Sequence, residues 1–235
     1  MPATGKILVE LQEHMGSDEA IANAAWTSSY DGLARKVLRA QQERVATLVR
    51  RLAEEGHAVP FESVVLRFWI RHPIFTDRQH MTHRIASHNG LSGRYRTMPD
   101  DWFPMPDDVK TIFARIQDPA AAPEVVWYDQ AIAHAYHYYE SAMGRLKAAR
   151  ADGKVNTAEF KRAREILRGV IPLAGMVERT TIMNLRSFAN YQRQRNSEHA
   201  QNEIRLVAEL MLQAVEETSV CPVALEALKG VGWRL

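Results

Sequence analysis

The chain has 235 residues, of which 46% are hydrophobic and 25% charged, as expected of one soluble domain spanning residues 1–235. Its net charge of +2 excludes a general nucleic-acid binder, so any anion site must be local. The single cysteine, Cys221, excludes a disulfide framework or a cysteine-based metal site within one chain. No stretch approaches the roughly 20 apolar residues of a membrane span, and the N-terminal residues lack a signal-peptide pattern. We therefore expect a cytoplasmic protein with neither a membrane nor a nucleic-acid polymer as partner.

The first part of the chain alternates between strand-like and helix-like patterns. Helical spacing of apolar residues is clearest over Leu33–Glu55, which ends at a glycine typical of a C-cap. Phe61–Arg71 is rich in β-branched and aromatic residues and predicts a strand. Pro73 then favours the first turn of a helix over Ile74–His88. Two shorter elements precede these, a strand at Lys6–Gln12 and an Ala-rich helix at Asp18–Ser28.

The remaining chain is mostly helical in pattern. Thr97–Asp108 carries three prolines and predicts an irregular segment that packs its aromatic residues as a lid or a subunit contact. The aromatic residues of the long helix expected at Val125–Arg150 favour a core or an interface. The other predicted elements are a linker at Asp118–Pro123, a helix at Thr157–Val170, a strand at Pro172–Met183, a helix at Asn184–Gln192 capped by Asn184, and a final helix from Asn196 or Ser197 to about Glu217.

The segment from Arg78 to Pro99 is cationic and contains no Asp, Glu or Lys. On the expected helix, Gln79, His83 and Ser87 would follow one ridge, and His80, Arg84 and His88 the next. A loop with two glycines follows, and such loops let a ligand approach the backbone closely. Arginine favours planar, two-pronged contacts with phosphate or carboxylate, although a solvated basic face is an equally open interpretation.

A second cationic segment runs from Asn184 to His199 and includes Arg186, Arg193 and Arg195. The two segments could converge on one polyanionic ligand. The sequence contains no P-loop and no Gly-x-Gly-x-x-Gly after a strand, and its cysteine is near neither segment. His134 and His137 have metal-ligand spacing but no evident third ligand, so we expect no metal. The residues by themselves therefore predict arginine-mediated binding of a phosphate-bearing small molecule, and no particular reaction.

Around these segments the chain resembles the flavin-dependent thymidylate synthases. Their motif is Arg-His-Arg, seven residues, then Ser; here Thr82-His83-Arg84 is followed by the seven residues Ile85–Leu91 and then Ser92. The similarity extends over about residues 20–217. It includes Gly56-His57, Pro60-Phe61-Glu62, Pro73-Ile74-Phe75, Ser92-Gly93-Arg94-Tyr95, Arg168, Asn184-x-Arg186, Asn190, Arg195, His199 and Gln201-x-Glu203-Ile204.

The resemblance implies an α/β fold with a twisted antiparallel sheet flanked by helices, and a homotetramer whose active sites are shared between subunits. It implies FAD as cofactor, NADPH as reductant and methylenetetrahydrofolate as the donor of one carbon to C5 of a uridylate. No enzyme cysteine attacks the substrate in such a family.

The resemblance also implies residue roles. Positions matching the flavin-binding residues are Thr82, His83, Arg84, Asn184, Arg186 and Asn190. Positions matching the nucleotide-binding residues, mostly around the phosphate, are Gln79, Gly90, Leu91, Ser92, Gly93, Arg94 and Arg168. Arg195 matches the arginine that contacts the uracil, where it would stabilise negative charge on the ring. Ser92 as a nucleophile is the less favoured interpretation, because the sequence places no base beside it.

Three positions depart from the family pattern: Val59 stands for a usual Thr, Thr82 for the first Arg of the motif, and Gly90 for a usual Glu. A pocket enlarged at Gly90 could admit the 2′-hydroxyl of UMP, as in branches of the family that serve nucleoside-antibiotic pathways. UMP and dUMP both stay open as substrates. Two alternatives to the methyltransferase also stay open: a uridylate 5-hydroxymethylase of the same family, and a catalytically degenerate nucleotide- or flavin-binding relative.

Overall fold

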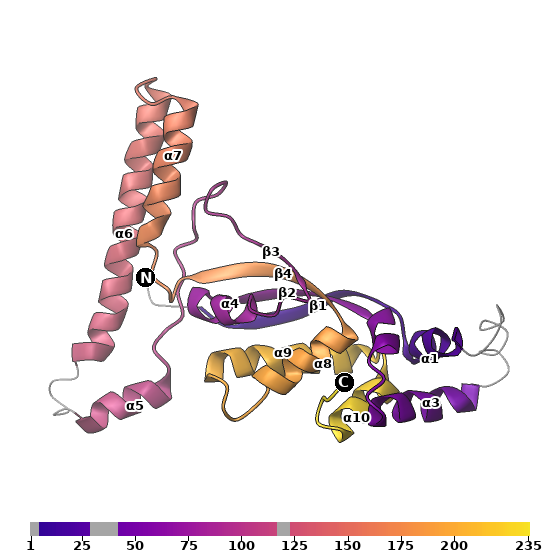
Figure 1. The fold of residues 1–235 in the computed structure, drawn as a ribbon. Helices are drawn as coiled ribbons and strands as arrows, with labels where there is room; N and C mark the ends of the chain where they lie inside the picture. Colours follow the sequence, from indigo (N-terminus) through magenta and orange to yellow (C-terminus); the bar gives the residue numbers. More distant parts are fainter. Residues whose placement is uncertain (1–4, 29–41, 117–122) are drawn as a thin grey trace. The chain divides into compact units, whose positions relative to one another are not determined.

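The computed structural model of the protein describes residues 5–28, 42–116 and 123–235 (Figure 1). Its contacts group these residues into two units. Unit 1 comprises the described residues up to Lys6 together with His72–Asp77 and Gly90–Glu178, and unit 2 comprises those of Ile7–Arg71, Arg78–Asn89 and Arg179–Leu235. The single domain over residues 1–235 stays a prediction. Residues 33–41 of the expected second helix and most of the expected linker lie outside the described residues.

Four strands form one open sheet in the order β1-β2-β4-β3. They are β1 (Leu8–Met15), β2 (Val65–Pro73), β3 (Ser87–Gly90) and β4 (Met176–Asn184). β1 and β2 pair antiparallel. Leu66, Phe68 and Ile70 are fully buried on one face of β2, as the two-residue period of a strand requires. Together with the flanking helices, this sheet confirms the predicted fold class.

Two strands begin later than the sequence predicts, because a turn precedes each of them. Phe61 lies in a short 3-10 helix, η1 (Val59–Ser63), which Pro60 initiates with its fixed φ. Pro172 lies in a turn, closed by a hydrogen bond of 2.9 Å from Gly175 N to Pro172 O. The strand predictions were thus right in type and wrong at their first residues.

The helix predicted over Ile74–His88 is wrong in its second half. It ends at His80 as α4 (Ile74–His80), and Ser87 begins β3. A turn follows α4, in which the Thr82 hydroxyl donates to Gln79 O at 2.7 Å and the Thr82 N–H donates to the same carbonyl at 3.3 Å. The two predicted helical ridges therefore do not form, although the rings of His80 and His88 do meet, with centroids 5.1 Å apart.

Unit 2 packs its helices around η1 and the strands that it contains. These helices are α1 (Asp18–Trp26), α3 (Gln42–Glu54), α8 (Leu185–Arg195), α9 (Asn202–Thr218) and α10 (Pro222–Gly230). Asn184 caps α8 as predicted, accepting from Ser187 N at 2.8 Å. α9 packs against β1, and Asp18 caps α10 by accepting the N–H groups of Val223 and Ala224.

The C-terminal half of unit 2 differs from the sequence prediction at two boundaries, the first being the end of α8, which was expected at Gln192 and lies at Arg195. The final long helix was expected from Asn196 or Ser197, but α9 begins at Asn202. Asn196 instead ends α8, with its N–H on Gln192 O and its side-chain amide on Gln192 Oε1. Near the C-terminus, Trp233 meets Phe188 of α8 edge-on, with ring centroids 6.1 Å apart.

Unit 1 is dominated by two long helices that lie side by side, α6 (Pro123–Ala151) and α7 (Thr157–Leu167), as Figure 1 shows. A 3-10 turn, η3 (Arg168–Val170), follows α7. Tyr136 and Tyr139 of α6 are buried whereas Trp127 and Tyr138 are exposed, so the prediction that the aromatic residues of this helix lie in a core or an interface is confirmed for the two buried ones. Thr97–Asp108 is irregular up to α5 (Asp107–Ile116), and its Trp102 is buried against Tyr136 with ring centroids 5.7 Å apart.

Candidate active site

In unit 2, three protein acceptors hold the guanidinium of Arg195. Its Nε donates to His83 Nε2 at 2.9 Å, and its Nη2 donates to Thr82 Oγ1 at 2.8 Å and to Gln79 O at 3.3 Å. All three acceptors come from the end of α4 and the turn after it, whereas Arg195 is the last residue of α8. The arginine is therefore fixed in place before any ligand binds, and its charge is not neutralised by a carboxylate at these contacts.

His83 is neutral in this arrangement. Its Nε2 accepts from a guanidinium that is always protonated, so the ring proton must reside on Nδ1. Burial, and secondarily the charges of Arg195 and His88, lower the pKa of His83 to about 4. The geometry and the pKa agree that His83 acts as an acceptor throughout the physiological pH range.

A buried hydrogen-bond chain supports His83 from behind. His80 lies between Tyr191 Oη at 2.9 Å and Thr181 Oγ1 at 2.8 Å, and His88 bonds the same threonine at 3.1 Å. His88 Nε2 also contacts His83 O at 3.2 Å, and Tyr191 packs on the His83 ring with centroids 4.5 Å apart. Burial raises the pKa of Tyr191 far above its usual value, so its phenol stays protonated. These contacts fix the position of the turn that carries His83.

A cleft of about 420 Å³ in unit 2 opens beside this turn. Five of the six predicted cofactor-binding residues line it: Thr82, His83, Arg84, Arg186 and Asn190. The sixth, Asn184, is the N-cap of α8 and is absent from the cleft wall. Residues about 100 positions apart in the sequence thus meet in one concave site, as the sequence predicted they could.

The charged residues of the cleft differ in their contacts. Arg186 pairs with Glu62 at 2.7 Å, and Asn190 Oδ1 accepts from Arg193 and Gln194, each at 3.0 Å. Arg84 is exposed and forms no hydrogen bond or ion pair with any residue in the described ranges. It is therefore free to contact an anionic ligand.

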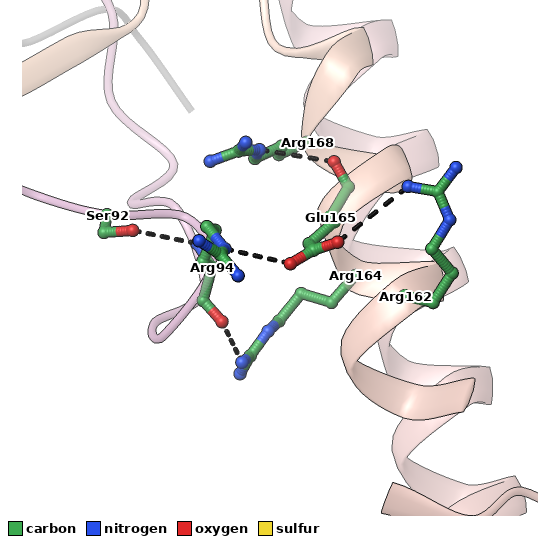
Figure 2. Close-up of polar contacts among 6 residues, drawn as sticks. All are labelled: Ser92, Arg94, Arg162, Arg164, Glu165 and Arg168. Atoms are coloured by element: carbon green, nitrogen blue, oxygen red, sulfur yellow. Dashed lines mark hydrogen bonds and ion pairs between the residues drawn. The ribbon is translucent and has the colours of Figure 1, made fainter. Parts of the chain in front are cut away.

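In unit 1, Ser92, Gly93 and Arg94 form a tight loop against α7 (Figure 2). Ser92 Oγ accepts from Arg94 N at 3.3 Å, and Arg94 Nε donates to Glu165 Oε1 at 2.9 Å. Arg164 binds the carbonyl of Arg94 and, at 3.2 Å, that of Tyr95. The loop is thus anchored to the helix through both its side chains and its backbone.

Arg168 reaches the same loop from η3. Its Nε donates to Glu165 O at 3.2 Å, and a Cβ placed on Gly93 would lie only 3.0 Å from Arg168 Cδ. A side chain at this position would therefore press on Arg168, whose aliphatic part would have to shift slightly. Within unit 1 the structure brings together Ser92, Gly93, Arg94 and Arg168, four of the predicted nucleotide-binding residues.

The other predicted residues lie at strand and helix ends. Gly90 ends β3, and Leu91 N donates to Glu178 O at 3.0 Å, so Leu91 continues the pairing with β4. In unit 2 the side-chain amide of Gln79 binds that of Gln201. Val59 is 71% exposed and lines a separate, largely apolar cleft with Trp26 and Pro60. A threonine at this position would present its hydroxyl to that cleft.

From the sequence, Glu165 is assigned to no site, and Glu62 is named only as part of a matching motif, without a partner. Glu165 binds Arg94, and Glu62 binds Arg186. Spacing offered one signal for the first, since Glu165 precedes Arg168 by three residues on the same helical face. No local signal links Glu62 to Arg186, which lie 124 residues apart.

Metal and membrane elements are absent from what the structure describes. Across residues 5–28, 42–116 and 123–235, no three His, Cys, Asp or Glu side chains gather as a metal site would require. No helix within those ranges has the length and apolar character to cross a bilayer.

The fold is mixed α/β, and each of its two units carries a cluster of arginines on the positions that the sequence analysis singled out. Comparison with known proteins identifies the family. Residues 10–223 match the family described as thymidylate synthase complementing protein. The flavin-dependent thymidylate synthase of Thermotoga neapolitana is 32% identical over 228 residues, covering 97% of this chain and 93% of that protein. The one from Kosmotoga olearia is 31% identical over 231 residues, covering 94% and 90%.

Comparison with solved structures supports the same family. A UMP/dUMP methylase, PolB from Streptomyces cacaoi bound with 5-Br dUMP, is 26% identical with a TM-score of 0.72, covering 99% of each chain. The same methylase bound with 5-Br UMP has a TM-score of 0.71. The chain belongs to the thymidylate synthase complementing protein family, which includes the flavin-dependent thymidylate synthases.

Proposed function

We propose that this protein catalyses the reductive C5-methylation of a uridylate, UMP or dUMP. FAD is the flavin, NADPH the reductant and methylenetetrahydrofolate the one-carbon donor. One observation carries the proposal: Thr82, His83 and Arg84 line one cleft with Arg186 and Asn190, beside an Arg195 that is already fixed. Family membership supports the same reaction.

The cleft fits a flavin dinucleotide by the chemistry of its wall. Arg84 and Arg193 offer cations for a diphosphate, and Ile85, which is 72% exposed, offers an apolar surface for a ring. Ser187 Oγ is buried at this wall and has no hydrogen-bond partner among the described residues. An unpaired buried hydroxyl is costly, so a ligand polar group is its natural partner. When bound there, the flavin would supply the hydride equivalent for the reductive step.

Arg195 is the residue that we assign to the uracil. Negative charge that develops on the ring and its carbonyls makes C5 more nucleophilic, and a fixed guanidinium stabilises that charge without reorganising. Neutral acceptors hold Arg195 at its contacts with Gln79, Thr82 and His83, so its positive charge stays available. His83 cannot serve as a general acid at neutral pH, because its pKa is near 4.

The loop of unit 1 is assigned to the nucleotide phosphate. Arg94 and Arg168 supply two guanidinium groups, and Ser92 and Gly93 supply a backbone that a ligand can approach closely. We extend the proposal to a homotetramer in which subunits share active sites, on the basis of the family resemblance.

Gly90 motivates a preference for UMP, or at least its acceptance. No side chain at this position occupies the space where the family pattern has a glutamate. The solved relative named as a UMP/dUMP methylase gives the idea independent support, since that protein is described as handling both ribose forms.

The decisive experiment incubates the purified protein and FAD with UMP or dUMP, methylenetetrahydrofolate and NADPH, and measures product mass and kcat/KM. The expected products are the 5-methyl nucleotides, with UMP used at least as well as dUMP. A 5-hydroxymethyl product would establish the hydroxymethylase alternative. No product from a protein that binds flavin would indicate a degenerate relative, and a strong preference for dUMP would remove the UMP hypothesis alone.

A further inference from the structure

Both arginines assigned to the phosphate are anchored on one residue, Glu165 (Figure 2). The carboxylate Oε1 of Glu165 accepts from Arg94 Nε at 2.9 Å. The main-chain oxygen of the same residue accepts from Arg168 Nε at 3.2 Å. One position on α7 therefore sets the orientation of two side chains that lie 74 residues apart in the sequence.

The atom used for anchoring matters. A guanidinium has five N–H donors in a planar fork, and the two terminal nitrogens are those that grip a phosphate end-on. Because Glu165 engages only Nε in each case, Nη1 and Nη2 of Arg94 and of Arg168 form no hydrogen bond to any residue in the described ranges. Both forks are oriented and still open.

The charges around Glu165 keep the site attractive to an anion. Arg162 lies 3.8 Å from the other carboxylate oxygen, and Arg164 is turned away onto the carbonyls of Arg94 and Tyr95. Four arginines thus lie around Glu165, two of them paired with its carboxylate, which leaves a surplus of positive charge among these residues. The side chain of Glu165 is 27% exposed whereas that of Arg94 is 56% exposed, so the carboxylate is the more enclosed partner and Arg94 the more accessible one.

We propose that Glu165 is a positioning residue for phosphate binding. It presets Arg94 through its side chain and Arg168 through its backbone, so that both guanidinium forks face the nucleotide phosphate. The inference rests on the proposed function in taking that phosphate as the ligand. It differs from a placeholder role, in which Glu165 would occupy Arg94 until the nucleotide displaces it.

Three substitutions separate these roles. Glu165→Ala removes the acceptor, Glu165→Asp keeps the charge but withdraws it from Arg94, and Glu165→Gln keeps an acceptor oxygen without the charge. If Glu165 positions the arginines, Glu165→Ala and Glu165→Asp should each raise the dissociation constant for inorganic phosphate and the KM for the nucleotide about tenfold. This is the effect of losing one charge-assisted hydrogen bond. In Glu165→Gln, both constants should stay within about threefold of the wild-type values. The kcat should change little in all three variants.

The measurement is phosphate binding to the flavin-loaded protein by titration calorimetry, followed by steady-state kinetics. Glu140→Ala is the matched control, because Glu140 is an exposed carboxylate on α6 that forms no hydrogen bond or ion pair with any described residue. Tighter phosphate binding in Glu165→Ala would overturn the proposal in favour of a placeholder. Unchanged binding in both Ala and Asp would also overturn it, leaving Glu165 a structural residue.

Phosphate binding does not depend on methyl transfer, so failure of the proposed function and failure of this inference are distinguishable. A protein that makes no methylated uridylate but loses phosphate affinity in Glu165→Asp retains the positioning residue. Uridine, which lacks the phosphate, should bind the wild type and Glu165→Ala equally, and a difference there would contradict a role limited to the phosphate.

Discussion

The two arginine clusters are held by opposite kinds of acceptor. Arg195 in unit 2 rests on a neutral imidazole, a hydroxyl and a carbonyl, whereas Arg94 in unit 1 rests on a carboxylate. A neutral acceptor fixes the guanidinium and leaves its charge intact. A carboxylate fixes it more strongly but cancels part of that charge.

The difference matches the charge that each site would face. A uracil ring acquires only part of a negative charge, so a guanidinium beside it is most effective when nothing nearby neutralises it. A phosphate carries its full charge already and meets several arginines, so one carboxylate in the cluster is tolerable. The acceptor at each arginine therefore indicates whether its role is to stabilise developing charge or to grip a formed anion.

Replacing Arg195 should have the largest effect. Arg195→Ala removes the charge assigned to the uracil and is expected to lower kcat at least about a hundredfold, as loss of a transition-state donor does. The flavin absorbance of the purified variant should persist, because the cleft wall is otherwise intact. Undiminished turnover would contradict the assigned role of Arg195.

Replacing an arginine of the other cluster should act on binding instead. In Arg168→Lys, the single ammonium group cannot donate to Glu165 O and also bind the phosphate with two prongs. The KM for the nucleotide should therefore rise about tenfold with kcat nearly unchanged. Arg162→Lys on the same helix is the control and should change KM less than about twofold, since its exposed ion pair is long. A fall in kcat without a rise in KM would place Arg168 at the chemistry rather than at the phosphate.

The hydroxyl of Thr82 allows a finer test of the three neutral acceptors that hold Arg195. Thr82→Val keeps the shape but leaves Arg195 without one acceptor, and kcat should fall about fivefold. Thr82→Ser restores an acceptor and should recover most of the activity. Equal kcat values for Thr82→Val and Thr82→Ser in steady-state kinetics would show that the hydroxyl does not position Arg195.

His83 should reveal itself in the pH dependence of stability. Its pKa is about 4 in the folded protein and about 6.5 when unfolded, so the unfolded chain binds more protons between these values. Stability linked to His83 is therefore fully present above pH 6.5 and is lost as the pH falls toward 4. His83→Gln should flatten the rise of Tm between pH 4.5 and 6.5 by about 2–4 °C, because the half-exposed ring is partly screened. Parallel Tm profiles for the two proteins would show that His83 is not the titrating group.

The sequence was most informative where the chemistry depends on residue type and order. Thr82-His83-Arg84, Ser92-Gly93-Arg94, Arg168 and Arg195 stand in an order that predicted the family, and the comparisons confirm it. Local signals also predicted the Asn184 cap and the amphipathic helix whose described part is α3, because caps and 3.6-residue periodicity involve only near neighbours. The roles assigned to these residues stay predictions.

Only the tertiary structure decided how the arginines are held. α4 ends at His80, whose ring bonds Tyr191 and Thr181, 111 and 101 residues away, and the helical periodicity of the segment cannot reveal such contacts. The contact of Arg195 with His83 spans 112 residues and that of Arg94 with Glu165 spans 71, and no local pattern encodes such pairs. Order along the chain predicted which arginines matter, and long-range packing alone determined which acceptor each one meets and therefore how much of its charge remains available.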